Sequence, residues 1–349
     1  MDRYGDTGAA ERGSGEIALY PGRKAQPIAV APLPDADLSG VRSVVLSPDL
    51  EWLALSIGSR SAVWNLKNGK TYPFSPFNGG SISADGVWTT TFEQTEPGTT
   101  TQGDKKFFVR ASVDLSVGKD VSYVKLPDKK PGETVAFSGP YEFTTLTNSP
   151  EKGWHTIRVK DTRTGQIAWT REMDMMPQRQ LGNALVLGFP AADKYADSVI
   201  KKSAELKKRL EEIPRRQDAT LLEVLDVATG KPLGYVMVDA AAGSVQIRSV
   251  RVGGRTLFLE DNNNRMLAYS LDTGERTGQE FGQVLAIDPV RTQVAVQNQL
   301  GRIMVFDASM QRVAEFEYPR NVIFAGFDGQ GRRLLTVTGA QEVFIENLP

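Results

Sequence analysis

The sequence lacks cysteine altogether and contains a single histidine, His155. Without cysteine the chain forms no disulfide bond, carries no thiolate nucleophile and offers no sulfur ligand to a metal. One imidazole is too few for the His-rich sites that hold zinc. The paired carboxylates also lack the Asp-x-Asp-x-Asp-Gly spacing of a calcium loop. We therefore expect no metal site and no cofactor.

An excess of one charge and long apolar runs are also lacking. The 41 Lys and Arg residues nearly balance the 42 Asp and Glu residues, so the formal net charge is −1. Nucleic-acid binding needs clustered, uncompensated basic residues, and we expect no nucleic-acid partner. No apolar run reaches the roughly 18 residues of a membrane-spanning helix, and residues 1–15 lack the apolar core of a signal peptide. We expect no membrane insertion and a cytoplasmic location; a periplasmic one would follow if the N-terminus were truncated.

Strands and tight turns account for most of what is present. Residues 41–70 read as three apolar strands separated by the turns 47–49 and 58–59, and they end in the polar turn 67–70. The second half of this unit recurs as VWNLKNGKTYPF, VKDTRTGQIAWT, VLDVATGKPLGYV, AYSLDTGERTGQEF and MVFDASMQRVAEF. Each copy is an apolar strand, a polar turn that often ends in Thr-Gly or Asn-Gly, and a second strand. Such turns favour residues that tolerate positive φ, which is typical of a tight hairpin.

These repeated hairpins resemble the WD-repeat β-propellers and their divergent bacterial relatives. The Trp-Asp pair of that family is represented by Trp64-Asn65, and the Asp-x-x-Thr-Gly turns with Trp169 also look like quinoprotein-type propellers. The resemblance covers residues 16–349 and implies an all-β fold, a propeller of seven blades with four antiparallel strands each. The units count as six complete blades and a three-strand seventh. Strands at 16–31 would supply the missing strand and close the ring, whereas eight blades would follow if 107–126 formed its own blade.

One segment interrupts the repeat. Residues 191–213 are rich in Ala, Lys, Glu and Leu, and they predict one inserted α-helix that Pro214 stops. Oppositely charged i,i+4 pairs are expected at Lys201–Glu205 and Lys207–Glu211. A narrow apolar stripe at helical spacing comprises Val199, Leu206, Leu210 and Ile213. Two interpretations stay open, because the stripe could pack on its own propeller or engage a partner.

The functional expectation is a non-catalytic protein–protein interaction scaffold. His155 would need an orienting carboxylate and a nucleophile to act as a general base, and no motif supplies them. We expect partners of unknown identity to bind the propeller face and the inserted helix. The candidate contact residues are Tyr195, Val199, Leu206, Leu210, Trp154 and His155. One alternative is a small-ligand-binding, hydrolase or quinone-type propeller with its site at the central channel. Another is the propeller domain of a larger protein. For all three interpretations, we expect residues 1–15 to form a flexible leader or linker. Residues 16–349 are expected to form a single domain, with 191–216 as its helical insertion.

Overall fold

A computed structural model describes most of the chain from Ile17 onward, and the expected leader at 1–15 lies outside the described residues. The described residues are 17–20, 28–30, 41–57, 60–68, 71–74, 81–82, 86–96, 105–115, 119–125, 133–138, 140–149, 154–161, 163–174, 177–181, 184–239, 247–288, 290–319, 321–338 and 342–349. They fall into two compact units. The first takes its residues from 1–128, 285–306 and 312–349, and the second takes its residues from 129–284 and 307–311.

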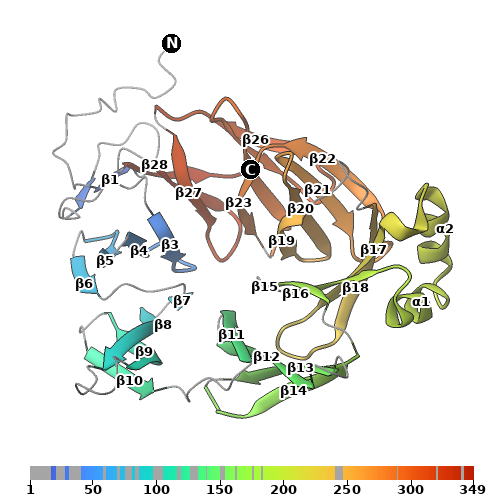
Figure 1. Cartoon of the computed structure of the whole chain (residues 1–349). Helices are drawn as coiled ribbons and strands as arrows, with labels where there is room; N and C mark the ends of the chain where they lie inside the picture. Colours follow the sequence, from blue (N-terminus) through green and yellow to red (C-terminus); the bar gives the residue numbers. More distant parts are fainter. Residues whose placement is uncertain are drawn as a thin grey trace. The chain divides into compact units, whose positions relative to one another are not determined.

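The strands form seven sheets in which neighbours in sequence pair antiparallel, and each sheet is one blade of a β-propeller (Figure 1). The hairpin repeat therefore predicts the fold class and the blade number correctly. The blades are blade 1 (β3 Val41–Leu46, β4 Trp52–Ile57, β5 Arg60–Asn65, β6 Thr71–Phe74), blade 2 (β7 Ser81–Ile82, β8 Val87–Glu96, β9 Lys105–Asp114, β10 Lys119–Lys125), blade 3 (β11 Glu133–Ser138, β12 Tyr141–Ser149, β13 Trp154–Asp161, β14 Ile167–Met173), blade 4 (β15 Gln178–Leu181, β16 Leu185–Pro190, β17 Ala219–Leu225, β18 Pro232–Asp239), blade 5 (β19 Ile247–Gly253, β20 Thr256–Asp261, β21 Arg265–Ser270, β22 Arg276–Phe281), blade 6 (β23 Gln283–Asp288, β24 Gln293–Gln297, β25 Ile303–Phe306, β26 Arg312–Phe316) and blade 7 (β27 Val322–Phe327, β28 Arg333–Thr338, β29 Glu342–Asn347).

Blade 7 is completed by strands from the other end of the chain. β1 (Ile17–Tyr20) pairs with β29 in parallel, with Leu19 opposite Val343, and β2 (Ile28–Val30) pairs antiparallel with β1. The N-terminal segment thus supplies the outer strand that blade 7 lacks. The segment 107–126 forms no blade of its own, because β9 and β10 share a sheet with β7 and β8.

Tight turns join the third and fourth strands of blades 3, 4 and 5. The glycines Gly165, Gly230 and Gly274 have φ of 72°, 67° and 69°, a region that side chains with a β-carbon seldom enter. Each glycine donates its N–H at 2.8 Å to the carbonyl oxygen four residues before it. Thus the Thr-Gly signature of the sequence reflects one backbone geometry used three times.

The residue four positions after each turn glycine packs against the following blade's turn. Trp169 lies over Gly230 and donates its indole N–H to the Val227 carbonyl at 2.8 Å. At the equivalent positions, a β-carbon on Gly234 would overlap the backbone of Leu271, and one on Gly278 would overlap the side chain of Met310. The repeat therefore specifies how neighbouring blades contact each other as well as how each hairpin turns.

The insertion between β16 and β17 forms two helices, α1 (Lys194–Ile200) and α2 (Ala204–Glu212), followed by a short 3₁₀ turn at Arg216–Asp218. The expectation of one helix over 191–213 is therefore corrected. Ser203 has extended backbone angles (φ −117°, ψ 123°), and its hydroxyl accepts the Leu206 N–H at 3.2 Å, so it ends one helix and caps the next. The break also separates Lys201 from Glu205, and Lys201 forms an ion pair with Asp197 instead.

Both helices pack on the outer side of blade 4, next to β16 and β18 (Figure 1). Leu206 is buried, and Val199, Leu210 and Ile213 are partly buried against the same hydrophobic cluster. This cluster also takes apolar side chains from blades 3 and 4, among them Ile157, Val159, Leu185, Leu187, Phe189, Leu221 and Leu225. The stripe that the sequence assigns to the insertion therefore packs against the insertion's own propeller.

Candidate functional site

A buried carboxylate, Glu223 of β17, fixes α1 on blade 4. Its side chain is 1 % exposed, and Arg171 of β14 donates to it at 2.8 Å. The Tyr195 hydroxyl of α1 donates at 2.7 Å, and the Tyr235 hydroxyl of β18 lies at 3.4 Å. A buried charge is tolerated when it is paired and hydrogen-bonded. These contacts join two blades and the insertion through one side chain.

The same environment keeps both phenols protonated. Burial, then the hydrogen bond to Glu223 and the charge of Glu223, raise the pKa of Tyr195 above its ordinary value of 10.0, and Arg171 offsets part of the effect. Burial, followed by the charge of Glu223, also raises the pKa of Tyr235. Both hydroxyls are therefore stable donors near neutral pH. The Arg171 guanidinium lies 4.7 Å from the Tyr195 ring centroid, which adds a cation–π contact.

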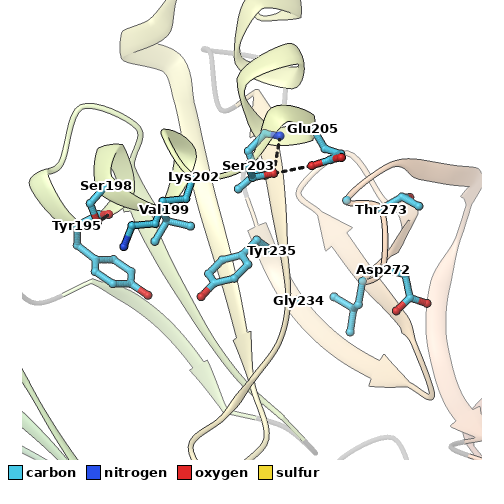
Figure 2. Close-up of a pocket in the computed structure, with 13 residues that line it drawn as sticks. Tyr195, Ser198, Val199, Lys202, Ser203, Glu205, Gly234, Tyr235, Asp272 and Thr273 are labelled. Carbon is cyan, nitrogen blue, oxygen red and sulfur yellow. Dashed lines mark hydrogen bonds between the residues drawn. The ribbon is translucent and has the colours of Figure 1, made fainter.

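Above this cluster lies a groove of about 450 Å³ between the insertion and the turn 271–274 of blade 5. Figure 2 shows Tyr195 and Tyr235 with their hydroxyls directed toward each other, Ser198 and Val199 on one side, and Asp272 and Thr273 on the other. The full lining comprises Tyr195, Ser198, Val199, Lys202, Ser203, Glu205, Leu206, Gly234, Tyr235, Leu271, Asp272, Thr273 and Gly274. Aromatic and aliphatic side chains thus form the floor, and polar side chains form the rim.

Most rim charges already have partners. Arg255 donates to Asp272 at 2.7 and 2.9 Å, and the Ser203 hydroxyl donates to Glu205 at 2.9 Å. A backbone N–H and then this hydroxyl lower the pKa of Glu205, so it is ionised near neutral pH. Among the described residues, Lys202 has no ion-pair partner. It is therefore the one lining cation that is available to an incoming group.

One further ion pair ties the insertion to blade 5. Arg209 of α2 donates to Glu275 at 2.9 Å, immediately after the turn that lines the groove, and to Glu212 of its own helix at 2.7 Å. The two walls are therefore connected by an ion pair as well as by the shared floor. Because Glu275 is exposed and Arg209 is partly exposed, this ion pair contributes little stability by itself.

The structure brings together only some of the predicted contact residues. Tyr195, Val199 and Leu206 line the groove, whereas Leu210 packs against the hydrophobic cluster outside the lining. Trp154 and His155 begin β13 and are not among the lining residues. The partly buried His155 ring lies 3.3 Å from the Thr147 hydroxyl. A partner-contact role for any of these six residues stays a prediction.

The sequence alone does not identify the groove wall formed by the turn 271–274, or Glu223, which holds the tyrosines from beneath the floor. Tyr235 and the turn 271–274 come from strands distant in sequence, and the Thr-Gly pattern marks that turn only as a hairpin. Glu223 could have been recognised from the sequence by aligning blade 4 with blade 5. It occupies the position that Leu267 holds in blade 5 and Arg158 holds in blade 3, seven residues before the turn glycine, so it is a carboxylate where blade 5 has an apolar side chain.

The groove is chemically suited to binding. Within the part of the chain that the structure describes, no three His, Cys, Asp or Glu side chains are grouped to hold a metal ion. Glu223 is held by its donors beneath the floor, where it is inaccessible to a substrate. The same described segments include no helix with the length and apolarity to cross a bilayer. What the groove offers is an aromatic floor, hydroxyl groups and one unpaired amine.

Comparisons with known proteins find no matching family model and no similar curated protein. Solved structures that are similar include Kluyveromyces lactis Hsv2, at 10 % identity with a TM-score of 0.46 over 88 % of this chain and 97 % of that chain. A Dos1 propeller is 10 % identical, with a TM-score of 0.48 over 85 % and 74 % of the two chains. BamB from Moraxella catarrhalis is 12 % identical, with a TM-score of 0.48 over 96 % and 91 %. The fold assignment rests on the seven sheets, six of four strands and one of five, and the predicted β-propeller fold is confirmed.

Proposed function

We propose that this chain is a non-catalytic protein-interaction module that binds partners at the groove between its helical insertion and blade 5, and through the propeller face. One observation carries the proposal. The insertion departs from the repeat, and where it meets the turn 271–274 it leaves half-buried tyrosines at the floor of a groove. Protein interfaces favour aromatic side chains at their centre and polar groups at their rim.

Two further features support a binding role. The bond network of Glu223 holds the tyrosines in one geometry, and preorganised side chains lose less entropy when a partner binds. The groove also lies at an insertion, where specificity is commonly added to a repeated scaffold. As part of this proposal, the two units belong to one domain over 16–349, and the protein acts in the cytoplasm.

Site-specific photo-crosslinking in the native host tests the proposal. A photoreactive amino acid replaces Ser198, which is exposed on the groove wall, and a matched probe replaces Lys125, which is exposed on β10 of blade 2. We expect a discrete crosslinked protein from position 198 that is absent from position 125. Equal crosslinking from both positions, or none from position 198 in cells that contain soluble, folded protein, would contradict the proposal.

A loop exchange provides a second test. In blade 5, the second and third strands are joined by the short link Asn262–Asn264, whereas blade 4 has the insertion 191–218 at that place. Grafting the short link into blade 4, together with E223L and R171M to remove the stranded charges, should abolish crosslinking by a probe at Thr273 and leave the propeller folded. Retention of the crosslinked partner would show that the helices are not needed for binding.

A further inference from the structure

We infer that the groove takes an acidic peptide segment of a partner protein, one that inserts a single bulky apolar side chain between Tyr195, Tyr235 and Leu271. This inference rests on the proposed function and names the chemistry of the partner. It follows from the shape of the floor and from the charges around it. Both are features of the second unit alone.

The floor is built for one apolar side chain. Leu206 and Leu271 are 4 % exposed, and the two tyrosine rings stand beside them with their hydroxyls engaged at Glu223. Since those hydroxyls are directed into the protein, the rings present their carbon edges and faces to the groove. A volume of about 450 Å³ lies within the usual range for ligand pockets. A large aliphatic or aromatic residue of a peptide fits within this space.

The net charge of the insertion is opposite in sign to that of the whole chain. Residues 191–218 contain eight Lys and Arg against six Asp and Glu, whereas the whole chain contains 41 against 42. Among the described residues, five cations of this segment have no ion-pair partner: Lys194, Lys202, Lys207, Lys208 and Arg215. The four carboxylates without a cation are Asp193, Glu205, Glu211 and Asp218, and two of them, Asp193 and Glu205, accept capping or hydroxyl hydrogen bonds. Among the described residues of the insertion, the uncompensated charges are therefore five positive and four negative, an excess of one cation.

Lys202 links the two features, since it lines the groove and its charge is uncompensated. Lys207 and Lys208 follow on the exposed side of α2. On the blade-5 side, Asp272 is neutralised by Arg255 and Glu275 by Arg209. A peptide whose apolar residue enters the groove would thus place flanking carboxylates near the amines of Lys202, Lys207 and Lys208. Glu205 is the one lining carboxylate without a cation among the described residues, and it accepts the Ser203 hydroxyl. Such rim charges govern association rate and specificity more than total affinity.

Selection from a random library identifies the preferred peptide without assuming its sequence. The full chain is panned against phage-displayed random dodecapeptides, and consensus peptides are synthesised with a fluorescent label for anisotropy titrations. We expect net acidic peptides with one large apolar residue. Replacing that residue with Ala should weaken binding by about tenfold, the loss of a buried anchor. Enrichment of neutral or basic peptides, or no enrichment, would overturn the inference.

A charge-reversed protein tests the cations directly. The variant K202E/K207E/K208E changes three exposed side chains, so it should melt like the wild type. It should bind the selected peptides at least about tenfold more weakly, and wild-type binding should fall as salt rises. The matched control is R332E, an exposed cation on blade 7. Equal effects of both variants would overturn the inference, as would a dimer, seen by sedimentation, that the triple variant abolishes.

The two proposals can fail separately. If position 198 crosslinks a partner but the panned peptides are not acidic, the interaction module stands and its acidic specificity is wrong. If acidic peptides bind through Lys202 but no cellular protein crosslinks at the groove, the peptide site exists and the proposed function is wrong.

Discussion

Blades 4 and 5 start from the same hairpin, with Gly230 and Gly274 in equivalent turns, yet they differ in how their second and third strands are joined. Blade 5 uses a short turn that Asp261 caps by accepting the N–H groups of Asn263 and Arg265. Blade 4 inserts two helices and replaces the apolar Leu267 position with Glu223. The difference shows that an insertion on a repeat must be anchored, and that here the anchor is a charge placed inside the sheet.

The largest expected effect concerns that anchor. E223A leaves Arg171 and two tyrosine hydroxyls without their acceptor, so we expect it to lower the free energy of unfolding by about 3 kcal/mol. D272A removes the exposed Arg255–Asp272 pair of blade 5 and should cost less than about 1 kcal/mol. Urea titrations followed by tryptophan fluorescence measure both. Equal effects would mean that Glu223 is not an anchor, while R171M/E223L should recover much of the loss.

A second contrast concerns the glycines that follow the two turns. G234A would force a methyl group against the backbone carbonyl of Leu271, whereas G278A would meet the Cγ and Cβ atoms of Met310. We expect a loss of about 2 kcal/mol for G234A and about 1 kcal/mol for G278A, because part of the overlap with Met310 involves Cγ, which moves more readily than a backbone carbonyl. Thermal melts measure both variants. A larger loss for G278A would disprove the close approach of blades 4 and 5.

The two tyrosines give a finer comparison within blade 4. Y195F removes a 2.7 Å hydrogen bond to a buried carboxylate and should cost about 1.5 kcal/mol. Y235F removes a contact of 3.4 Å and should cost less than about 0.5 kcal/mol. Both are measured by urea titration at neutral pH. The reverse order would show that Tyr235, on β18, holds Glu223 more firmly than the helix does.

The alkaline limit of stability should depend on blade 4. Because the pKa of Tyr195 is raised in the folded state, the unfolded chain loses this proton first as pH rises above about 10, and folding then becomes less favourable. The stabilisation is fully present below that pH. Unfolding midpoints between pH 9 and pH 11 should therefore fall less steeply for Y195F than for the wild type. Identical slopes would contradict a raised pKa.

The loss of folding stability at low pH should depend on Asp-capped turns such as the one at Asp261 in blade 5. Burial opposes ionisation of Asp261, but hydrogen bonds from the Arg265 side chain and from backbone N–H groups more than offset this and lower its pKa. The unfolded chain therefore takes up this proton first as pH falls below about 4, and stability is lost there. D261N should flatten the decline between pH 5 and pH 2. A slope as steep as that of the wild type would exclude Asp261 as a contributor.

The repeated hairpins could be predicted because their determinants are local. A turn glycine, a Thr before it and flanking apolar residues specify blades 3, 4 and 5 within a dozen positions. The completion of blade 7 by residues 16–31 follows from counting strands, but the parallel direction of β1 against β29 depends on tertiary pairing and could not be predicted. The composition of 191–213 correctly predicts helical structure. It does not predict the extended backbone of Ser203, which divides the segment into two helices.

The groove is less predictable than the fold. Val199 and Leu206 follow from the helical stripe, because apolar periodicity marks the helix side chains that pack against another element. The other wall, Leu271–Gly274, lies more than sixty positions away, and it appears in sequence only as another hairpin turn. Which hairpin meets the insertion depends on Gly234, where the absent side chain lets the strand touch Leu271.

The pairing of β1 with β29 has a consequence for synthesis of the chain. β1 leaves the ribosome before its partner strand at Glu342–Asn347, and more than 300 residues are made between them. During that interval the two strand edges that belong together are unpaired, and unpaired edges favour association between chains. Completion of blade 7 therefore awaits β29, however early the other blades fold.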